Sequence, residues 1–161
     1  MEKFYGFDLG DAESAVARLN KENQDVPEVL LVADAKSFIT AYALKKDGSL
    51  IIGEKACYEP EVTSRKLHFK SRFLTDKEAQ KDIKSFAGGV LGELYLNGDV
   101  IKGEDSCFYI GCPAGWDKLD REIYRFLNDG LCLYPRREGR RTADRWRSLL
   151  RRRHYGRDLT G

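Results

Sequence analysis

The chain has 161 residues, of which 42% are apolar and 34% are charged, and its formal net charge is +2. This length and composition predict one soluble globular domain with a core of its own. No apolar run approaches the roughly 18 residues of a membrane helix, which excludes a protein that spans a membrane in that way. No signal-peptide pattern precedes the first predicted strand, so we expect a cytoplasmic protein.

The net charge conceals two stretches of different composition. Residues 1–118 carry 13 Lys and 3 Arg against 20 acidic residues, a net charge of −4. Residues 119–161 carry 12 Arg and no Lys against 6 acidic residues, a net charge of +6. The two stretches therefore differ in residue usage as well as in charge.

The chain is predicted to open with a β-hairpin made by residues 4–9 and 14–19. Asp8 lies at the end of the first strand, and Gly10 and Asp11 supply the turn chemistry of the tip. An acidic residue before a turn and a glycine inside it therefore characterise this hairpin.

The middle of the chain predicts short strands. Apolar runs at residues 29–32 and 38–44 predict two of them, and a turn at residues 46–49 leads back into a third at residues 50–52. Residues 53–59 predict a short helix.

The strongest helix prediction begins at Thr75, which with Glu78 forms a capping box. Apolar residues then recur at helical spacing until a C-terminal signal at residues 97–98. Two glycines at residues 88–89 weaken this helix by about 1 kcal/mol each relative to alanine.

A buried strand at residues 107–112 follows, Pro113 breaks it, and Asp117 is predicted to cap a second long helix. Several strands, a long helix, a strand and a helix predict a mixed α/β layer architecture.

The four cysteines are Cys57, Cys107, Cys112 and Cys132. They contain no C-x-x-C pair and no metal-ligand spacing with either histidine. We expect four buried or free thiols.

The tip of the first hairpin has the chemistry of a phosphate loop. Gly10 lets the backbone approach a phosphate closely, and the N–H groups of the turn can point at its oxygens. Asp8 at the strand end can hold Mg²⁺ directly or through water. The tripeptide alone is not specific, because many hairpin turns contain Asp and Gly only in order to bend.

Four segments in order resemble DnaK-type heat-shock chaperones. Residues 5–17 (Tyr-Gly-Phe-Asp-Leu-Gly-Asp-Ala-Glu-Ser and on) resemble the family's first phosphate loop, Gly-Ile-Asp-Leu-Gly-Thr-Thr-Asn-Ser. Residues 51–56 (Ile-Ile-Gly-Glu-Lys-Ala) resemble its Ile-Gly-x-x-Ala stretch, and residues 69–74 (Phe-Lys-Ser-Arg-Phe-Leu) its Phe-Asp-x-Lys-Arg-Leu segment. Residues 109–117 (Tyr-Ile-Gly-Cys-Pro-Ala-Gly-Trp-Asp) resemble Val-x-Thr-Val-Pro-Ala-x-Phe-Asn/Asp, which a helix follows in both.

The resemblance implies an α/β fold, namely the first lobe of an actin-like (ribonuclease H-like) nucleotide-binding domain, at residues 1–126. It implies ATP or ADP with Mg²⁺ as ligands, Asp8 as the residue that organises the metal ion, and Gly10, Asp11 and Ala12 as the phosphate-binding backbone.

The resemblance also assigns two residues outside the hairpin. Arg72, with Lys70 as the alternative, stands where the family keeps a catalytic lysine near the γ-phosphate. Pro113 stands where a proline couples nucleotide state to the partner domain. An arginine in place of lysine exchanges a point charge for a planar fork.

The tip departs from the family pattern, because Asp11 and Ala12 replace paired threonines whose hydroxyls donate to phosphate. With Asp8 and Glu13, three carboxylates then surround one turn, which repels phosphate unless Mg²⁺ intervenes. The resemblance implies a second lobe with its own phosphate loop, to which no segment of this sequence corresponds, so we expect a chain that binds ATP weakly and does not hydrolyse it alone.

The leading interpretation is an N-terminal fragment of an ATP-binding chaperone, whose client proteins and co-chaperones bind through missing regions. The alternative is a non-enzymatic binding module in which the exposed face of the lobe binds a partner or a second copy. Neither interpretation involves a membrane or favours nucleic acid as the main partner.

The arginine-rich tail at residues 127–161 leaves three interpretations open. Residues 142–153 could form a basic amphipathic helix that binds nucleic acid or an acidic membrane surface. The tail could be a solvated, partly disordered terminus. A shift of reading frame near codon 126 is the third, and the change in residue usage where the resemblance ends favours it.

Overall fold

The computed structural model describes residues 3–19, 27–101, 104 and 106–128. Of the arginine-rich tail at residues 127–161, residues 129–161 lie outside the described residues, and the three interpretations of the tail lie outside them too. The expected boundary at residue 126 falls inside the last described helix, α3 (Lys118–Asn128).

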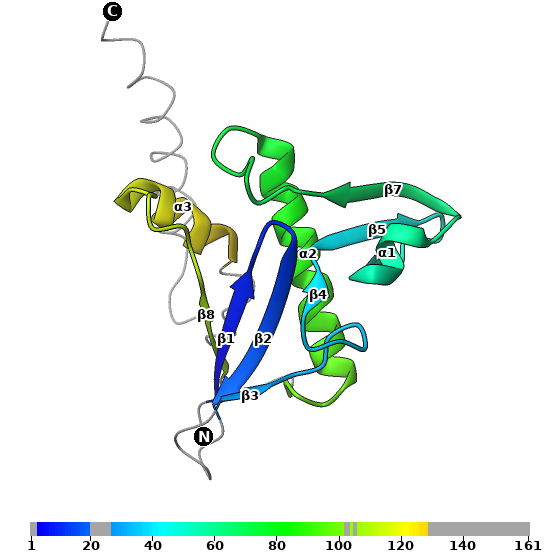
Figure 1. The fold of residues 1–161 in the computed structure, drawn as a ribbon, viewed down its shortest axis with the longest axis horizontal. Coiled ribbons are helices and arrows are strands. Elements are labelled where there is room, and N and C mark those ends of the chain that lie inside the picture. The colour runs from blue at the N-terminus through cyan, green and yellow to red at the C-terminus, as the bar shows by residue number, and fades with distance from the viewer. Residues whose placement is uncertain (1–2, 20–26, 102–103, 105, 129–161) are drawn as a thin grey trace, which may run out of the picture.

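The larger of two sheets is built around the first hairpin (Figure 1). Its strands are β1 (Lys3–Leu9), β2 (Glu13–Leu19), β3 (Pro27–Val29) and β8 (Ser106–Ile110), in the order β3-β2-β1-β8. β4 (Phe38–Ile39) also pairs with β2. β1 is antiparallel to β2 and parallel to β8, so the predicted hairpin and the late strand are both confirmed and lie side by side.

The smaller sheet has the order β6-β5-β7 and carries the short predicted helix beside it (Figure 1). Its strands are β5 (Ala41–Lys45), β6 (Leu50–Ile52) and β7 (Val62–Leu67), and the helix is α1 (Glu54–Tyr58). The hairpin β5–β6 and the helix α1 were predicted correctly, whereas β7 was not predicted. Only the first and last residues of β7 are apolar, so its sequence lacks the alternation that marks a strand.

The predicted strand at residues 38–44 is wrong in one respect, because the chain changes sheets at Thr40. The Thr40 N–H donates to the carbonyl of Ala12 at 2.8 Å, and its hydroxyl lies 2.7 Å from the buried hydroxyl of Ser14. These bonds hold Thr40 at the hairpin tip. The strand before it therefore joins the larger sheet and the strand after it joins the smaller one.

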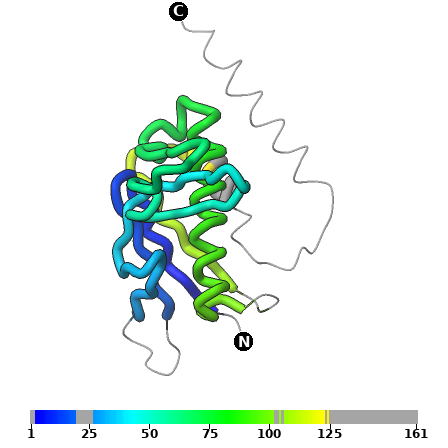
Figure 2. The backbone as a smooth tube through the Cα atoms, turned by 90° about the vertical axis from the view of Figure 1, so that its right-hand side faces the viewer, coloured from blue at the N-terminus to red at the C-terminus, as the bar shows by residue number. Residues whose placement is uncertain are grey.

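The long helix α2 (Lys77–Leu96) packs across one face of the larger sheet (Figure 2). Its N-cap is Asp76, one residue later than predicted, because the carboxylate of Asp76 accepts a hydrogen bond from the Glu78 N–H at 2.8 Å. Thr75 instead donates its hydroxyl to the carbonyl of Arg72. The predicted end is confirmed, with Asn97 as C-cap and Gly98 at a φ of +75°.

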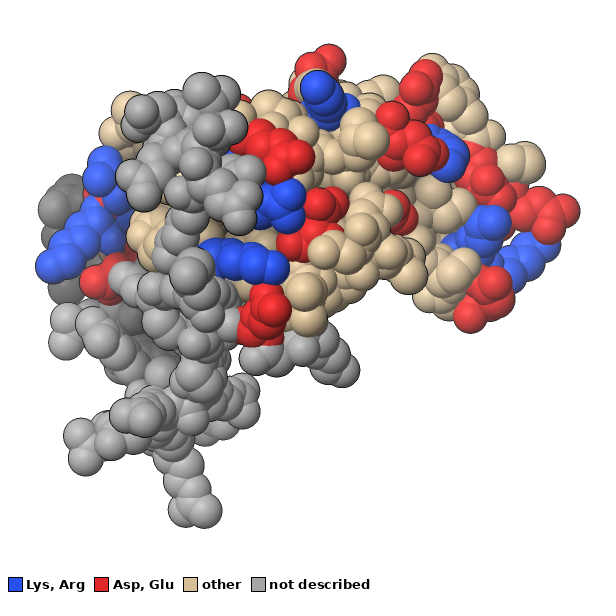
Figure 3. All heavy atoms as spheres, turned by 90° about the horizontal axis from the view of Figure 1, so that it is seen from below, with Lys and Arg blue, Asp and Glu red and all other residues tan. Residues whose placement is uncertain are grey.

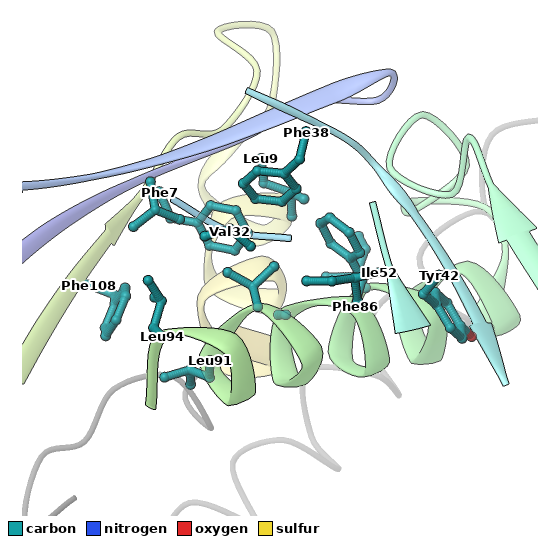
Figure 4. Packing of buried hydrophobic residues seen from close by; sticks show 14 of the residues in the cluster. Phe7, Leu9, Val32, Phe38, Tyr42, Ile52, Phe86, Leu91, Leu94 and Phe108 are labelled. Carbon is teal, nitrogen blue, oxygen red and sulfur yellow. The ribbon is translucent and has the colours of Figure 1, made fainter. Parts of the chain in front are cut away.

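The main core lies between α2 and this sheet face (Figure 4). Tyr5, Phe7 and Leu9 of β1 are each no more than 1% exposed, while Gly6 and Asp8 between them face outward. The α2 residues predicted to be buried are all in this core: Ala79, Ile83, Phe86, Ala87, Val90, Leu91 and Leu94. The alternation along β1 shows that α2 covers one face of the sheet and not the other.

The two glycines of α2 have different surroundings. A β-carbon on Gly89 would lie 2.5 Å from Leu50 Cδ2 and 2.6 Å from Ile52 Cγ2, whereas one on Gly88 would meet nothing within 4 Å. Gly89 therefore lets α2 approach β6 closely. Gly88→Ala should raise the free energy of unfolding by about 1 kcal/mol through helix propensity.

Gly89→Ala should lower the free energy of unfolding by about 1 kcal/mol or more in spite of the same gain in propensity, because the packed side chains of Leu50 and Ile52 must move aside. Urea denaturation of both variants measures the difference. Equal stabilisation by the two substitutions would contradict the close approach.

The described cysteines are free thiols, as predicted: Cys57 is half-buried, Cys107 is buried and Cys112 is exposed beyond the end of β8. Cys132 lies outside the described residues. No helix in the described part of the chain combines the length and the apolarity that a membrane span requires.

Candidate functional site

The hairpin tip and the end of β8 meet at one edge of the larger sheet. Parallel pairing of β1 with β8 brings the carboxyl ends of both strands to this edge, and the Gly111 N–H donates to the carbonyl of Phe7 at 3.2 Å. The exposed carboxylate of Asp8 has its Oδ1 3.9 Å from the position that a β-carbon on Gly111 would take. A glycine at 111 thus keeps the space beside Asp8 open.

The segment from His68 to Asp76 lies against this edge and presents Lys70 to the hairpin. The Lys70 ammonium donates a hydrogen bond to the carbonyl of Leu9. Burial lowers the pKa of Lys70, while the negative charges of Asp8 and Asp11 act in the opposite direction. A half-buried cation thus lies beside the carboxylate that the resemblance assigns to Mg²⁺.

The Arg72 side chain contacts residues of its own segment, His68 and Asp76. Its Nη1 lies 3.1 Å from Oδ2 of Asp76, the N-cap of α2, and its Nε donates to the carbonyl of His68 at 3.2 Å. Of the two cations that the sequence offered for the γ-phosphate, the geometry therefore favours Lys70 over Arg72. Sequence reasoning placed them in the opposite order because Arg72 follows the family's Lys-Arg-Leu spacing more closely.

The Asp11 carboxylate, at the tip, reaches across to the same segment. Its Oδ1 accepts from the Ser71 N–H at 2.9 Å, and its Oδ2 lies 3.3 Å from Nδ1 of His68. Burial raises the pKa of Asp11, but the hydrogen bonds from Ser71 and His68 outweigh it, so the net pKa is below its ordinary value. Asp11 remains ionised and is paired.

The expected crowding of three carboxylates at one turn is therefore reduced. Asp11 is bound to residues 68–71, and the Glu13 carboxylate accepts from the hydroxyl of Ser37 at 2.9 Å. Asp8 is then the carboxylate that faces Gly111. One or two carboxylates, water and phosphate oxygens form a usual Mg²⁺ shell, so Asp8 fits the magnesium role that the resemblance implies.

The described residues contain no group of three or more His, Cys, Asp or Glu side chains that could hold a metal ion by themselves.

Gly10 and Ala12 have structural roles at the tip. A β-carbon on Gly10 would lie 2.1 Å from the carbonyl oxygen of Glu13, so the turn requires glycine there. The carbonyl of Ala12 accepts the Thr40 N–H and joins the tip to the start of the smaller sheet. These contacts fix the shape of the turn whose N–H groups are the candidate phosphate ligands.

Pro113 begins a turn that packs against the segment that carries Lys70. Its carbonyl accepts the Trp116 N–H at 3.2 Å, and the Trp116 ring stacks on Phe73 with centroids 5.1 Å apart. Asp117 caps α3 as predicted, since its Oδ1 accepts from the Asp120 N–H at 2.8 Å. The sequence did not point to Phe73 as a residue of the site, although its ring joins this turn to the segment that carries Lys70.

Comparison of this chain with known proteins finds similarity to solved structures. No protein-family model and no curated protein matches it. Two solved structures of MamK match this chain. One is a double helical filament, with a TM-score of 0.57, and the other is a non-polymerising mutant bound to AMPPNP, with a TM-score of 0.58. Each is 12% identical and covers 81% of this chain. The fold is part of an actin-like ATPase fold.

The chain spans 38% of the length of each of these MamK structures. The predicted fold class is therefore confirmed, including its incompleteness relative to the full fold. At 12% identity the match concerns the fold alone and does not distinguish DnaK-type chaperones from other actin-like proteins.

Proposed function

We propose that this chain is the first, ATP-binding lobe of a cytoplasmic actin-like ATPase of the DnaK chaperone type. The observation that carries the proposal is the convergence of Asp8, the hairpin tip and Lys70 at one edge of the sheet. A solved MamK neighbour bound to AMPPNP supports a nucleotide at this fold. The four ordered sequence segments support the chaperone type.

In this proposal several residues of the chain contact different parts of a bound nucleotide. The N–H groups of Gly10, Asp11 and Ala12 donate to phosphate oxygens, and the Lys70 ammonium offsets their charge. Asp8 holds Mg²⁺, which would supply further charge compensation when bound.

One lobe offers only part of such a site, so the chain alone should bind nucleotide weakly and not turn it over. Pro113 would couple nucleotide state to a partner domain. Client proteins and co-chaperones would bind regions beyond the matched lobe.

The test is titration of the purified chain with Mg-ATP by isothermal calorimetry. We expect weak, Mg²⁺-dependent binding that Lys70→Met and Asp8→Asn each weaken about tenfold or more, since each removes a charge-assisted contact. Arg72→Met is the matched control and should bind as the parent does, because Arg72 is engaged with Asp76. Circular dichroism verifies folding of each variant.

Absence of binding at millimolar Mg-ATP would refute a nucleotide function for this chain. Equal losses from Lys70→Met and Arg72→Met would refute the assignment of Lys70.

A second candidate function is a binding module, and the face of the larger sheet that no described element covers favours it. The face contains Gly6, Ala15 and Ala17, and Tyr109, Leu19 and Val29 on it are 65%, 44% and 42% exposed. The solvated face of a mainly antiparallel sheet usually carries polar side chains, whereas these exposed residues are large and apolar. A second copy of the chain is the occupant that we propose.

Sedimentation velocity of the purified chain separates the two functions. A dimer that Ala17→Asp abolishes, in a chain that binds no Mg-ATP, would favour the binding module. A monomer at all concentrations would exclude association through this face.

The face displayed in Figure 3 gives no support to nucleic-acid binding. The arginine-rich stretch on which such binding depends lies outside the described residues, and Figure 3 shows acidic and basic side chains interspersed over the face that it displays. Such a mixed surface does not form the basic stripe that follows a phosphate backbone.

A further inference from the structure

Two parts of the chain far apart in sequence are joined by one carboxylate. Asp11 lies at the hairpin tip, and its two oxygens take separate partners, the Ser71 N–H at 2.9 Å and the His68 ring at 3.3 Å. Lys70 lies between these partners in sequence and contacts the carbonyl of Leu9 on the same hairpin. Three contacts therefore hold residues 68–71 against the hairpin.

The segment that Asp11 holds has an irregular backbone that it would not adopt by local preference. His68 follows β7 directly and has a φ of +52°, in the left-handed region that β-carbons disfavour. Phe69 and Phe73 are both 0% exposed and anchor the segment to the core. Asp11 secures the opposite side of the segment, toward the hairpin.

We propose that Asp11 is a positioning residue whose carboxylate holds residues 68–71 on the hairpin tip and so sets the Lys70 ammonium beside Asp8. The consequence for ATP rests on the proposed function, whereas the positioning is a property of the unliganded chain. At this position the resembled family has a threonine that donates to phosphate, whereas Asp11 makes a contact that positions Lys70.

The proposal reverses a simple expectation about charge. If Asp11 only repelled phosphate, Asp11→Thr would strengthen ATP binding by removing a negative charge near the site. If Asp11 positions Lys70, the same substitution releases residues 68–71 and weakens binding.

The direct test measures the position of Lys70 without any nucleotide. The folded full chain is acetylated briefly with limiting N-hydroxysuccinimidyl acetate, and the rate at each lysine is read by peptide mass spectrometry. Lys81, whose side chain is 72% exposed on α2, is the internal reference. Lys70 should react more slowly than Lys81 in the parent chain, because the half-buried position of Lys70 restricts access of the reagent to its amine, whereas Lys81, although it bonds Glu78, is exposed.

Asp11→Ala should raise the rate at Lys70 about fivefold or more relative to Lys81, because about fivefold corresponds to one net hydrogen bond and the substitution removes two contacts. Asp11→Asn keeps an oxygen that can accept from the Ser71 N–H, so it should restore most of the protection. Glu13→Ala removes the other carboxylate of the turn, which bonds Ser37, and should leave Lys70 protected.

An unchanged Lys70 rate in Asp11→Ala would overturn the proposal, as would equal deprotection by Glu13→Ala. A rise at Lys81 as well would indicate general unfolding of Asp11→Ala. The Lys70 rate in Asp11→Asn, once circular dichroism has verified that this variant is folded, then decides: retained protection supports the proposal, and loss of protection overturns it. Mg-ATP titration of Asp11→Thr is the second measurement. Failure of every variant to bind ATP would count against the proposed function and leave the lysine result standing.

Discussion

Replacing Phe73 by alanine should lower the free energy of unfolding by about 3–5 kcal/mol, the range for a fully buried phenylalanine. The side chain is 0% exposed, and its ring stacks on Trp116 and meets Tyr124 edge-on with centroids 5.2 Å apart. These rings join the segment that carries Lys70 to the turn after β8 and to α3. The substitution should therefore loosen the site as well as the core.

Urea denaturation followed by circular dichroism measures the change. Phe73→Leu keeps most of the apolar volume and should cost less than about 1.5 kcal/mol. Tyr58→Ala is the surface control, because Tyr58 is 75% exposed, and it should change stability by no more than about 0.5 kcal/mol. A loss at Phe73 as small as that at Tyr58 would contradict the packing of α3 on this segment.

The elements with strong local signals could be predicted from the sequence. The β1–β2 hairpin follows from its turn residues, and α2 from apolar spacing over five turns and a C-terminal Asn97-Gly98. The predicted N-cap of α2 was wrong by one residue, because Thr75 and Asp76 are both good N-cap residues. Only the hydrogen bonds that their side chains make distinguish them.

The elements that tertiary contacts decide could not be predicted. β7 has two apolar residues and forms as an edge strand because β5 offers it a partner. The chain changes sheets at Thr40 through a buried hydroxyl contact with Ser14, to which no local pattern points. Such long-range contacts override propensity in short strands.

The residues of the candidate site also fall into those with a local sequence signal and those that tertiary contacts decide. Asp8 and Gly10 follow from a local motif, and the structure places both at the edge where β1 and β8 end. The choice between Arg72 and Lys70 depends on how the backbone turns at His68, whose positive φ has no sequence signal. Spacing alone could not show that Arg72 pairs with Asp76, the N-cap of α2, while Lys70 faces the hairpin.

Gly10→Ala should lower the free energy of unfolding by about 2–3 kcal/mol, near the upper range for overpacking. The added β-carbon would lie 2.1 Å from the Glu13 carbonyl oxygen, which is backbone and cannot rotate away, so the turn must open. Gly6→Ala, on the strand β1 that precedes the turn, is the matched control, since a β-carbon there meets nothing within 4 Å. It should be neutral or stabilise by up to about 1 kcal/mol, because alanine restricts the unfolded chain.

The pair of substitutions also separates two reasons for glycine at the tip. A glycine kept only for close approach of a phosphate would tolerate alanine in the urea experiment and lose affinity in the Mg-ATP titration. A glycine that the turn requires loses stability first, and opening the turn also moves Leu9 and Asp11, the two hairpin residues that contact the segment carrying Lys70. We therefore expect Gly10→Ala to expose Lys70 to acetylation as Asp11→Ala does, which Gly6→Ala should not do.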